Sequence, residues 1–176
     1  MGTNTTHPED IGVYYADADL PGFFRRCVAL IIDLTVVFLA IIVLALLARA
    51  FGLSETSFKV AALCLSWAYL AGLKAGPNGT LGYRIAGVQL VNLQGQPAGL
   101  LCCTYRFLLL LIGPLHLVFD LLWLTTDPNR QTLRDKLTAT CVVRRGSTPV
   151  APARLTHPTY FIATMAFALP EVKRPA

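Results

Sequence analysis

The sequence predicts an all-α membrane protein with two full transmembrane helices, a kinked or re-entrant third helical region and a small extramembrane β element. The first observation is composition: 55% of the 176 residues are hydrophobic and 14% are charged, whereas a soluble domain usually carries about 25% charged residues. The second is that apolar residues gather in three long segments, at residues 23–48, 58–73 and 100–126. The third is that polar and turn-forming residues separate these segments.

The first apolar segment is long enough to cross a bilayer. At about 1.5 Å per residue, a helix over residues 27–48 covers about 33 Å, and a hydrocarbon core is about 30 Å thick. The one charged residue within residues 27–48 is Asp33, and a carboxylate inside a spanning helix costs about 2.5–3.5 kcal/mol. Arg26 lies on the same face but about 10 Å away along the axis, so we expect Asp33 to take a partner from another helix. Asp33 is either a structural polar pin between helices or an ion or proton site.

The second apolar segment is rich in small side chains, which let helices approach closely in lipid. Extended to residues 53–75, it is long enough to span. Trp67 and Tyr69 lie in its middle, so we expect their polar atoms to face a partner or a cavity. In the polar connection that follows, residues 85–93 are rich in Val, Ile and Leu and predict a short strand, which could pair with a second candidate strand at residues 138–144 outside the bilayer.

The third apolar segment is interrupted by Gly113-Pro114 and by several polar residues. One interpretation is a single kinked span, and the other is two half-helices, residues 100–112 and 114–126, each too short to cross alone. Lys and Arg favour the cytoplasmic side, and they precede the first helix and follow the third segment. Two spans plus a re-entrant or interfacial pair, which place both termini in the cytoplasm, therefore fit better. We predict a multi-pass protein of the cell membrane, that is, an inner or plasma membrane.

The same pattern divides the chain into a polar N-terminal tail (1–21), a transmembrane domain (22–145) and a C-terminal linker and tail (146–176). The tail lacks the basic n-region of a signal peptide, so the first span is expected to remain as an anchor. The chain has a net charge of +5, and its basic residues flank apolar segments. This position indicates that they contact the membrane surface and not nucleic acid. No hydrolase, zinc-protease or P-loop motif is present, so we predict no enzyme. The five cysteines show no metal-ligand spacing, and no metal or cofactor is predicted.

Asp33, Arg106, His116 and Asp120 fall inside apolar segments, away from the ends of the first and third. If residues 100–126 form one helix, the last three lie close to one face. A carboxylate that binds a proton or monovalent cation, with an Arg or His tuning its charge, would form a relay, and these four are our candidates for an ion site. The alternative is that Arg106 neutralises Asp33 or Asp120 and that His116 is a packing residue.

Three blocks of the sequence resemble a known family. The run R-C-V-A-L-I-I-D (26–33) is similar to an R-x-x-A-x-x-I-D opening, T-L-G-Y-R-I-A-G-V-Q-L-V (80–91) to a T-x-G-K-R-x-x-G-x-x-V-V block, and R-Q-T-L-R-D-K-L-T-A-T-C-V-V (130–143) to an R-x-x-L-H-D-x-x-A-G-T-x-V-V end. Over about residues 22–144 the chain thus resembles the RDD family of small membrane proteins. Departures are Tyr83 in place of the usual Lys, Arg134 in place of a common His, and Thr138-Ala139 in place of Ala-Gly.

The resemblance implies a role for particular positions. The family is named for one Arg and two Asp, which correspond to Arg26, Asp33 and Asp135. Asp127 lies in a turn signal, D-P-N, where the third segment leaves the membrane. We expect Arg26, Asp127 and Asp135 to meet at the cytoplasmic interface and to clamp the re-entrant region onto the first helix. For some members of the family, transport of an unidentified ligand or ion–proton exchange has been suggested.

Two functions follow as hypotheses. The first is a transporter of a cation or small solute, coupled to protons through Asp33. The alternative is a non-transporting accessory or scaffold subunit that packs against another membrane protein through its second helix. The expected partners are the lipid bilayer and either further copies of the chain or another membrane protein. Because the chain has no internal repeat, a transport path would need an oligomer.

Overall fold

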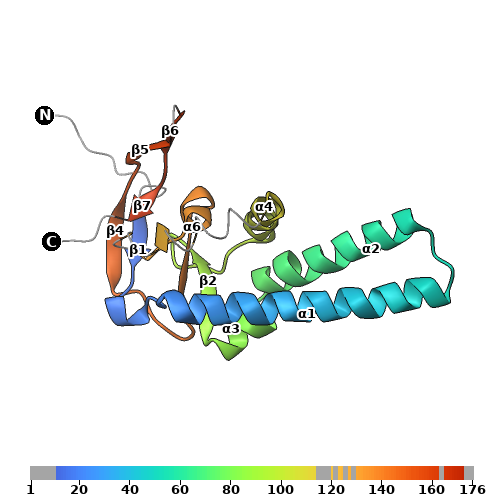
Figure 1. Ribbon diagram of the computed structural model, residues 1–176. Coiled ribbons are helices and arrows are strands. Elements are labelled where there is room, and N and C mark those ends of the chain that lie inside the picture. Colours follow the sequence, from blue (N-terminus) through green and yellow to red (C-terminus); the bar gives the residue numbers. More distant parts are fainter. Residues whose placement is uncertain are drawn as a thin grey trace, which may run out of the picture.

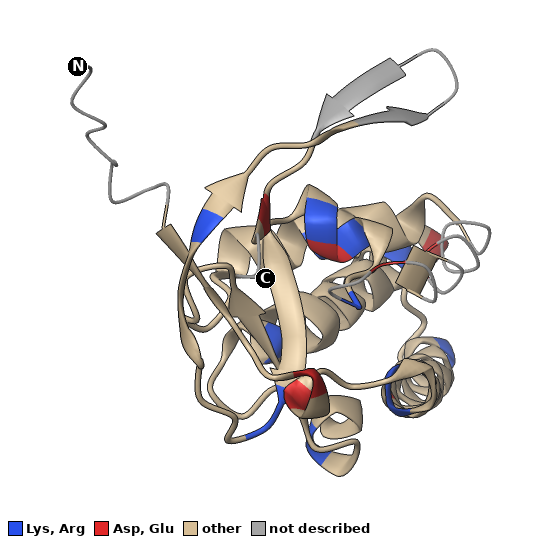
Figure 2. Ribbon diagram, turned by 90° about the vertical axis from the view of Figure 1, so that its left-hand side faces the viewer, with Lys and Arg blue, Asp and Glu red and all other residues tan. Residues whose placement is uncertain are grey.

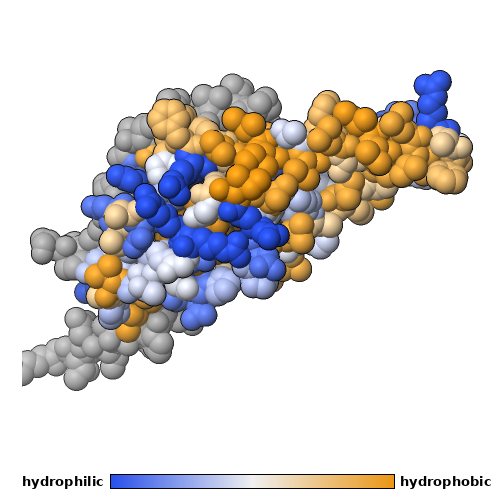
Figure 3. Space-filling model, turned by 90° about the horizontal axis from the view of Figure 1, so that it is seen from below, coloured by the Kyte–Doolittle hydropathy of each residue, from blue (hydrophilic) through white to orange (hydrophobic). Residues whose placement is uncertain are grey.

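The computed structural model describes residues 11–113, 120, 123–124, 127, 130–162 and 165–172. Figure 1 shows a long helical hairpin that projects from a body of short helices and small sheets. We call the part of the chain outside the hairpin and α4 the polar body. Lys, Arg, Asp and Glu are spread over its helices and strands (Figure 2), whereas apolar side chains cover the hairpin (Figure 3).

The hairpin consists of α1 (Phe23–Ala50) and α2 (Glu55–Trp67), which continues as the π-helical turn η3 (Ala68–Leu73). Two helical stretches, Asp17–Ala50 and Glu55–Leu73, are long and apolar enough to cross a membrane. Only 6% and 11% of their most apolar windows are buried, unlike the core helix of a soluble protein. Both predicted spans are therefore present as apolar helices whose exposed surface suits lipid.

Four elements of the polar body form two helix–strand pairs. Helix α3 (Leu81–Ile85) leads into β2 (Val88–Asn92), and α6 (Leu133–Leu137) leads into β3 (Thr140–Arg144). Strands β2 and β3 pair antiparallel, with Val88 opposite Arg144, which confirms the two predicted strands and their pairing. Leu90 and Val142 lie opposite each other and pack with Leu70, Ala71 and Phe107 in the largest apolar core. This core fixes the polar body to the base of the hairpin.

The third apolar segment begins as α4 (Leu100–Leu111). Its 12 residues cover about 18 Å, which is too short to cross a bilayer. The chain then turns at Gly113, whose φ is +132°, so one straight span is excluded. Figure 1 shows α4 end-on while α1 and α2 lie in the plane of the picture, so α4 runs across the hairpin. His116 lies outside the described residues.

The two ends of the chain differ from the predicted tails. Strand β1 (Ile11–Tyr14) and the 3-10 turn η2 (Asp17–Asp19) lie in the expected N-terminal tail. The expected C-terminal linker and tail hold four strands: β4 (Ala151–Thr156), β5 (Thr159–Ile162), β6 (Met165–Ala168) and β7 (Glu171–Val172). β4 lies between β1 and β7, all antiparallel, and β5 pairs with β6. The all-α prediction is thus too narrow, because these strands are short and show no alternation of apolar and polar residues that would reveal them.

Candidate functional site

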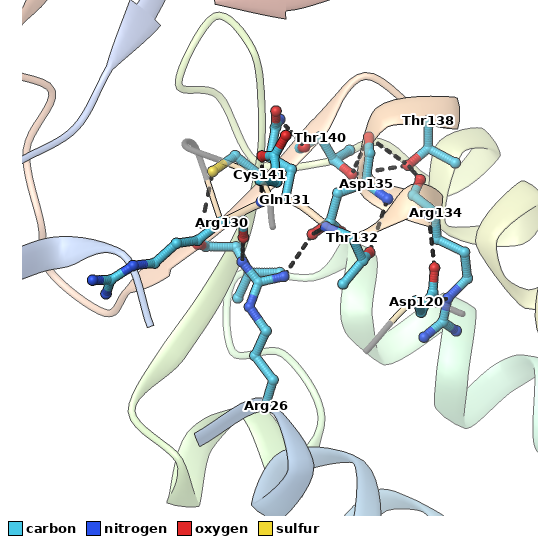
Figure 4. Close-up of polar contacts among 12 residues, drawn as sticks. Arg26, Asp120, Arg130, Gln131, Thr132, Arg134, Asp135, Thr138, Thr140 and Cys141 are labelled. Atoms are coloured by element: carbon cyan, nitrogen blue, oxygen red, sulfur yellow. Dashed lines mark hydrogen bonds and ion pairs between the residues drawn. The ribbon is translucent and has the colours of Figure 1, made fainter. Parts of the chain in front are cut away.

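Asp135 is the centre of a buried cluster of charges. It lies on α6 with no solvent exposure, and each of its two carboxylate oxygens contacts a different arginine. Arg26 Nη1 lies 2.6 Å from Oδ2, and Arg106 Nη1 lies 2.6 Å from Oδ1. Figure 4 shows Arg26 reaching from α1 toward the start of α6. One carboxylate therefore joins α1, α4 and α6.

The start of α6 holds Asp135 in place. Thr132 caps the helix: its Oγ1 accepts a hydrogen bond from Asp135 N, and the Asp135 carboxylate accepts one from Thr132 N. This reciprocal arrangement is a capping box with Asp in place of the usual Glu or Gln. Burial alone would raise the pKa of Asp135, but Arg106, Arg26 and the Thr132 amide outweigh it and hold that pKa well below its usual range. Asp135 is thus a permanent anion at neutral pH.

The two arginines use their remaining donors differently. Arg26 also donates from Nη2 to the Arg130 carbonyl at 2.5 Å, while its buried Nε has no hydrogen-bond partner within the described part of the chain. Arg106 donates from Nη1 to Thr138 and Thr140 as well as to Asp135. The expected contact of Arg26 with Asp135 is therefore confirmed. The expectation that Arg106 neutralises Asp33 or Asp120 was wrong, because packing of β3 and α6 against α4 brings Asp135 to Arg106 instead.

Asp33 occupies a separate site seven residues further along α1. It is 2% exposed and accepts three hydrogen bonds, all from neutral donors. Tyr69 Oη lies 3.1 Å and Gly82 N 2.8 Å from Oδ1, and Thr80 Oγ1 lies 2.7 Å from Oδ2. The predicted partner from another helix is thus Tyr69 of η3, and the start of α3 supplies the other two donors. Trp67 likewise finds a partner, donating to Thr104 on α4 at 3.1 Å.

Gly82 explains how α3 comes so close to Asp33. A Cβ atom at this position would lie 2.1 Å from the Ala29 carbonyl oxygen and 2.6 Å from Asp33 Oδ1. These distances are far below van der Waals contact, so only glycine lets the backbone of α3 approach α1 this closely. Asp33 therefore pins α3 to α1 through a backbone amide and a neighbouring hydroxyl.

The other two aspartates among the candidates bind basic residues of α6. Asp120 contacts Arg134 through the Arg134 backbone amide at 3.0 Å and through its Nε. Asp127 pairs with Lys136 and accepts a hydrogen bond from Gln131 N. Asp127 thus reaches the cluster through the residue next to Asp135 and makes no described contact with Arg26. Sequence analysis missed Lys136, which is 1% exposed, because a Lys in a basic segment resembles a surface residue.

A cavity of about 80 Å³ lies between the start of α1, the end of η3, α4 and α6. Its wall includes Asp33, the two arginines that bind Asp135, and the Asp120–Arg134 pair. The charged residues that line it are Arg26, Asp33, Lys74, Arg106, Asp120 and Arg134. Because about 10–15 Å³ of such volume holds one water, the cavity has room for on the order of six waters. Within the described ranges, no group of three or more His, Cys, Asp or Glu could hold a metal ion.

Comparison with known proteins identifies the family. A model described as "RDD family" matches residues 20–139, which is more than half of the chain. The chain belongs to the RDD family. No curated protein and no solved structure matches it. Together with the two apolar helices, membership of the RDD family makes this a membrane protein.

The positions that give the RDD family its name form two sites in this member. Arg26 and Asp135 form the ion pair at the start of α6, and Asp33 forms the pin between α1 and α3. Two departures from the family pattern also border the cavity. Arg134, where His is common, pairs with Asp120. Tyr83, where Lys is usual, has the ammonium of Lys74 at 4.3 Å from its ring centroid, so a cation still lies beside this position.

Proposed function

We propose that this RDD protein crosses the cell membrane twice, through α1 and α2, with α4 lying in the interface and both termini in the cytoplasm. The orientation of α4 across the hairpin supports this arrangement (Figure 1). Its surface supports it too: Leu101, Leu108 and Ile112 are exposed, whereas Arg106 and Phe107 are buried. A helix that lies flat in the membrane interface typically has one apolar face toward the lipid and an opposite face that does not contact the lipid. The excess of Lys and Arg in the polar body favours the cytoplasmic side.

Cysteine labelling in intact cells tests this topology. Thr56 is exposed at the start of α2 and Thr148 is exposed in the polar body, so each can be replaced by Cys and compared with the parent chain. A membrane-impermeant thiol reagent should label Thr56→Cys in intact cells and Thr148→Cys only after permeabilisation. Labelling of Thr148→Cys from outside would overturn the proposed orientation.

Within the membrane, we propose that the protein is a non-transporting accessory subunit of a membrane protein assembly. The observation that carries this proposal is that neutral donors of the chain hydrogen-bond both carboxylate oxygens of Asp33. Its carboxylate accepts three hydrogen bonds from neutral groups of the same chain, as a structural pin requires. The hairpin adds a second argument, because two helices with largely exposed surfaces enclose no path across a bilayer. Their lipid-facing surfaces are available to another membrane protein or a second copy.

Proton-coupled transport is the second candidate, because Asp33 borders a cavity large enough for water. Proteoliposomes with an internal pH dye and added Na⁺, K⁺ or Li⁺ separate the two functions. The accessory role predicts no cation-dependent proton flux in the wild type and a lower melting temperature for Asp33→Asn. A flux that disappears in a folded Asp33→Asn variant would establish transport and overturn the accessory role.

The mass of the native assembly tests the subunit proposal directly. Extraction from the membrane into lipid nanodiscs, without detergent, preserves contacts between helices. We expect the protein component of the particle to exceed the 19.1 kDa of one chain, through a second copy or a different membrane protein. A particle that contains a single chain and no other protein would contradict the proposal.

A further inference from the structure

The cavity beside Asp33 carries an excess of positive charge. Four basic residues line it, Arg26, Lys74, Arg106 and Arg134, against two acidic ones, Asp33 and Asp120. Asp135 does not line the cavity but pairs with Arg26 and Arg106. Counting it, three acidic residues stand against four basic ones. The undescribed segments between residues 113 and 130, which are 114–119, 121–122, 125–126 and 128–129, contain no Asp or Glu. No further carboxylate can therefore come from them.

The acidic groups in this wall have their acceptors engaged. Asp33 takes hydrogen bonds from Tyr69, Thr80 and Gly82. Asp120 binds the side chain and the backbone amide of Arg134. Added positive charge would consequently find no uncommitted carboxylate among the described residues of the cavity, so its wall is unsuited to a cation.

The basic groups, in contrast, keep unused donors. Arg26 Nε is buried and has no hydrogen-bond partner among the described residues. The described hydrogen bonds of the Arg106 side chain all leave from Nη1, and the described bond of the Arg134 side chain leaves from Nε. The Lys74 ammonium faces the ring of Tyr83, which supplies no anion. A buried donor without an acceptor is costly, and Arg26 Nε is such a donor among the described residues, so this cavity favours an anion that accepts hydrogen bonds.

Size and position narrow the class of anion. A cavity of about 80 Å³ holds on the order of six waters, comparable with the five heavy atoms of a phosphate group. It lies where α1 begins and η3 ends, at the end of the hairpin that meets the polar body (Figure 1). Hydrophilic residues of the polar body adjoin the apolar hairpin there (Figure 3). With the hairpin in a bilayer, this is the depth of the phospholipid phosphates.

We propose that this cavity binds the phosphate group of a membrane phospholipid. Guanidinium groups of Arg106 and Arg134 provide planar pairs of donors that match phosphate oxygens, and Lys74 adds a compact charge. The Arg26 Nε donor completes the wall from α1. Phosphate recognition follows from the cavity alone, whereas the lipid as its source rests on the proposed topology.

Binding to the purified protein in a neutral detergent tests the proposal. The probes are short-chain phosphatidic acid, inorganic phosphate and, as an anion control, chloride. We expect phosphatidic acid to bind and to raise the melting temperature. Lys74 has no described carboxylate partner, so Lys74→Gln should retain the fold while weakening binding by at least about tenfold, the loss expected for one charge-assisted hydrogen bond. Lys74→Arg should retain binding.

Lys59→Gln is the matched control, because it removes the same charge at the opposite end of the hairpin from an exposed pair with Glu55. Its affinity should equal that of the wild type. Equal weakening by Lys59→Gln and Lys74→Gln, or no binding of either phosphate probe, would overturn the site. Binding of inorganic phosphate but not phosphatidic acid would overturn the lipid as occupant. The labelling of Thr148→Cys tests the topology without reference to this affinity, so the two proposals fail separately.

Discussion

Replacing Asp135 by Asn tests whether the buried cluster holds the polar body on the hairpin. The substitution keeps the shape of the side chain but removes the charge shared by Arg26 and Arg106, each 2.6 Å away. Because Asp135 is fully buried, solvent does not screen the loss, and two buried guanidinium groups lose their counter-ion. Removing one partner of a buried ion pair costs about 3–5 kcal/mol, and we expect a loss of free energy of unfolding in that range.

The assay is reversible denaturant unfolding in detergent micelles, followed by circular dichroism. Glu55→Gln is the matched control, because it makes the same change of carboxylate to amide in the exposed pair with Lys59. Such a surface pair contributes about 0–1 kcal/mol. A loss for Asp135→Asn no larger than that for Glu55→Gln would refute the reasoning. A double-mutant cycle of Asp135→Asn and Arg26→Gln adds a second check. Because the two residues are in contact, their coupling energy should be at least about 0.5 kcal/mol.

Three further predictions concern the same elements. Gly82→Ala should destabilise the protein by about 1–3 kcal/mol or more, because the added Cβ would overlap the Ala29 carbonyl. Gly72→Ala is the control, because Gly72 has open space around it, and it should not destabilise the protein. Equal melting temperatures of the two variants would contradict this prediction. Because the folded pKa of Asp135 is depressed, its stabilisation is complete above its unfolded pKa of about 3.9 and declines as the pH falls below it. Wild type should therefore lose more stability between about pH 5 and 3 than Asp135→Asn, and parallel curves would argue against it. Thr132→Ala should cost about 1 kcal/mol through loss of the α6 cap, measured by the same unfolding assay, and an unchanged value would exclude the capping box.

The hairpin and the β2–β3 pair were predictable from the sequence because each carries a local signal. Long runs of apolar residues specify α1 and α2, and Val, Ile and Leu between turn residues specify the two strands. Strands β4 to β7 have two to six residues each, too few to show a sustained alternation of apolar and polar residues. β4 pairs with a distant segment, with Ile11 opposite Arg154, and such a pairing leaves no trace in the local pattern.

Some contacts of the candidate site could likewise be predicted from the sequence, and others could not. The contact of Arg26 with Asp135 could be predicted because the order of the family motifs pointed to both residues. The partners of Asp33 could not, because Tyr69, Thr80 and the Gly82 amide are uncharged and a search for countercharges passes over them. The T-L-G block was the available signal, since a Thr at a helix start followed by Gly indicates a cap and a close backbone approach. Transport and the accessory role both stay predictions.

The distance in sequence between Arg26 and Asp135, 109 residues, has a consequence for biogenesis. A ribosome delivers α1, α2 and then the arginine of α4 before it delivers α6, and Arg106 precedes Asp135 by 29 residues. Until then, Arg26 and Arg106 have not met the carboxylate that neutralises them, and the polar body cannot close on the hairpin. The late arrival of Asp135 thus makes membrane insertion of the hairpin and closure of the polar body on it two successive events. A nascent chain halted before residue 135 would leave both arginines without this carboxylate.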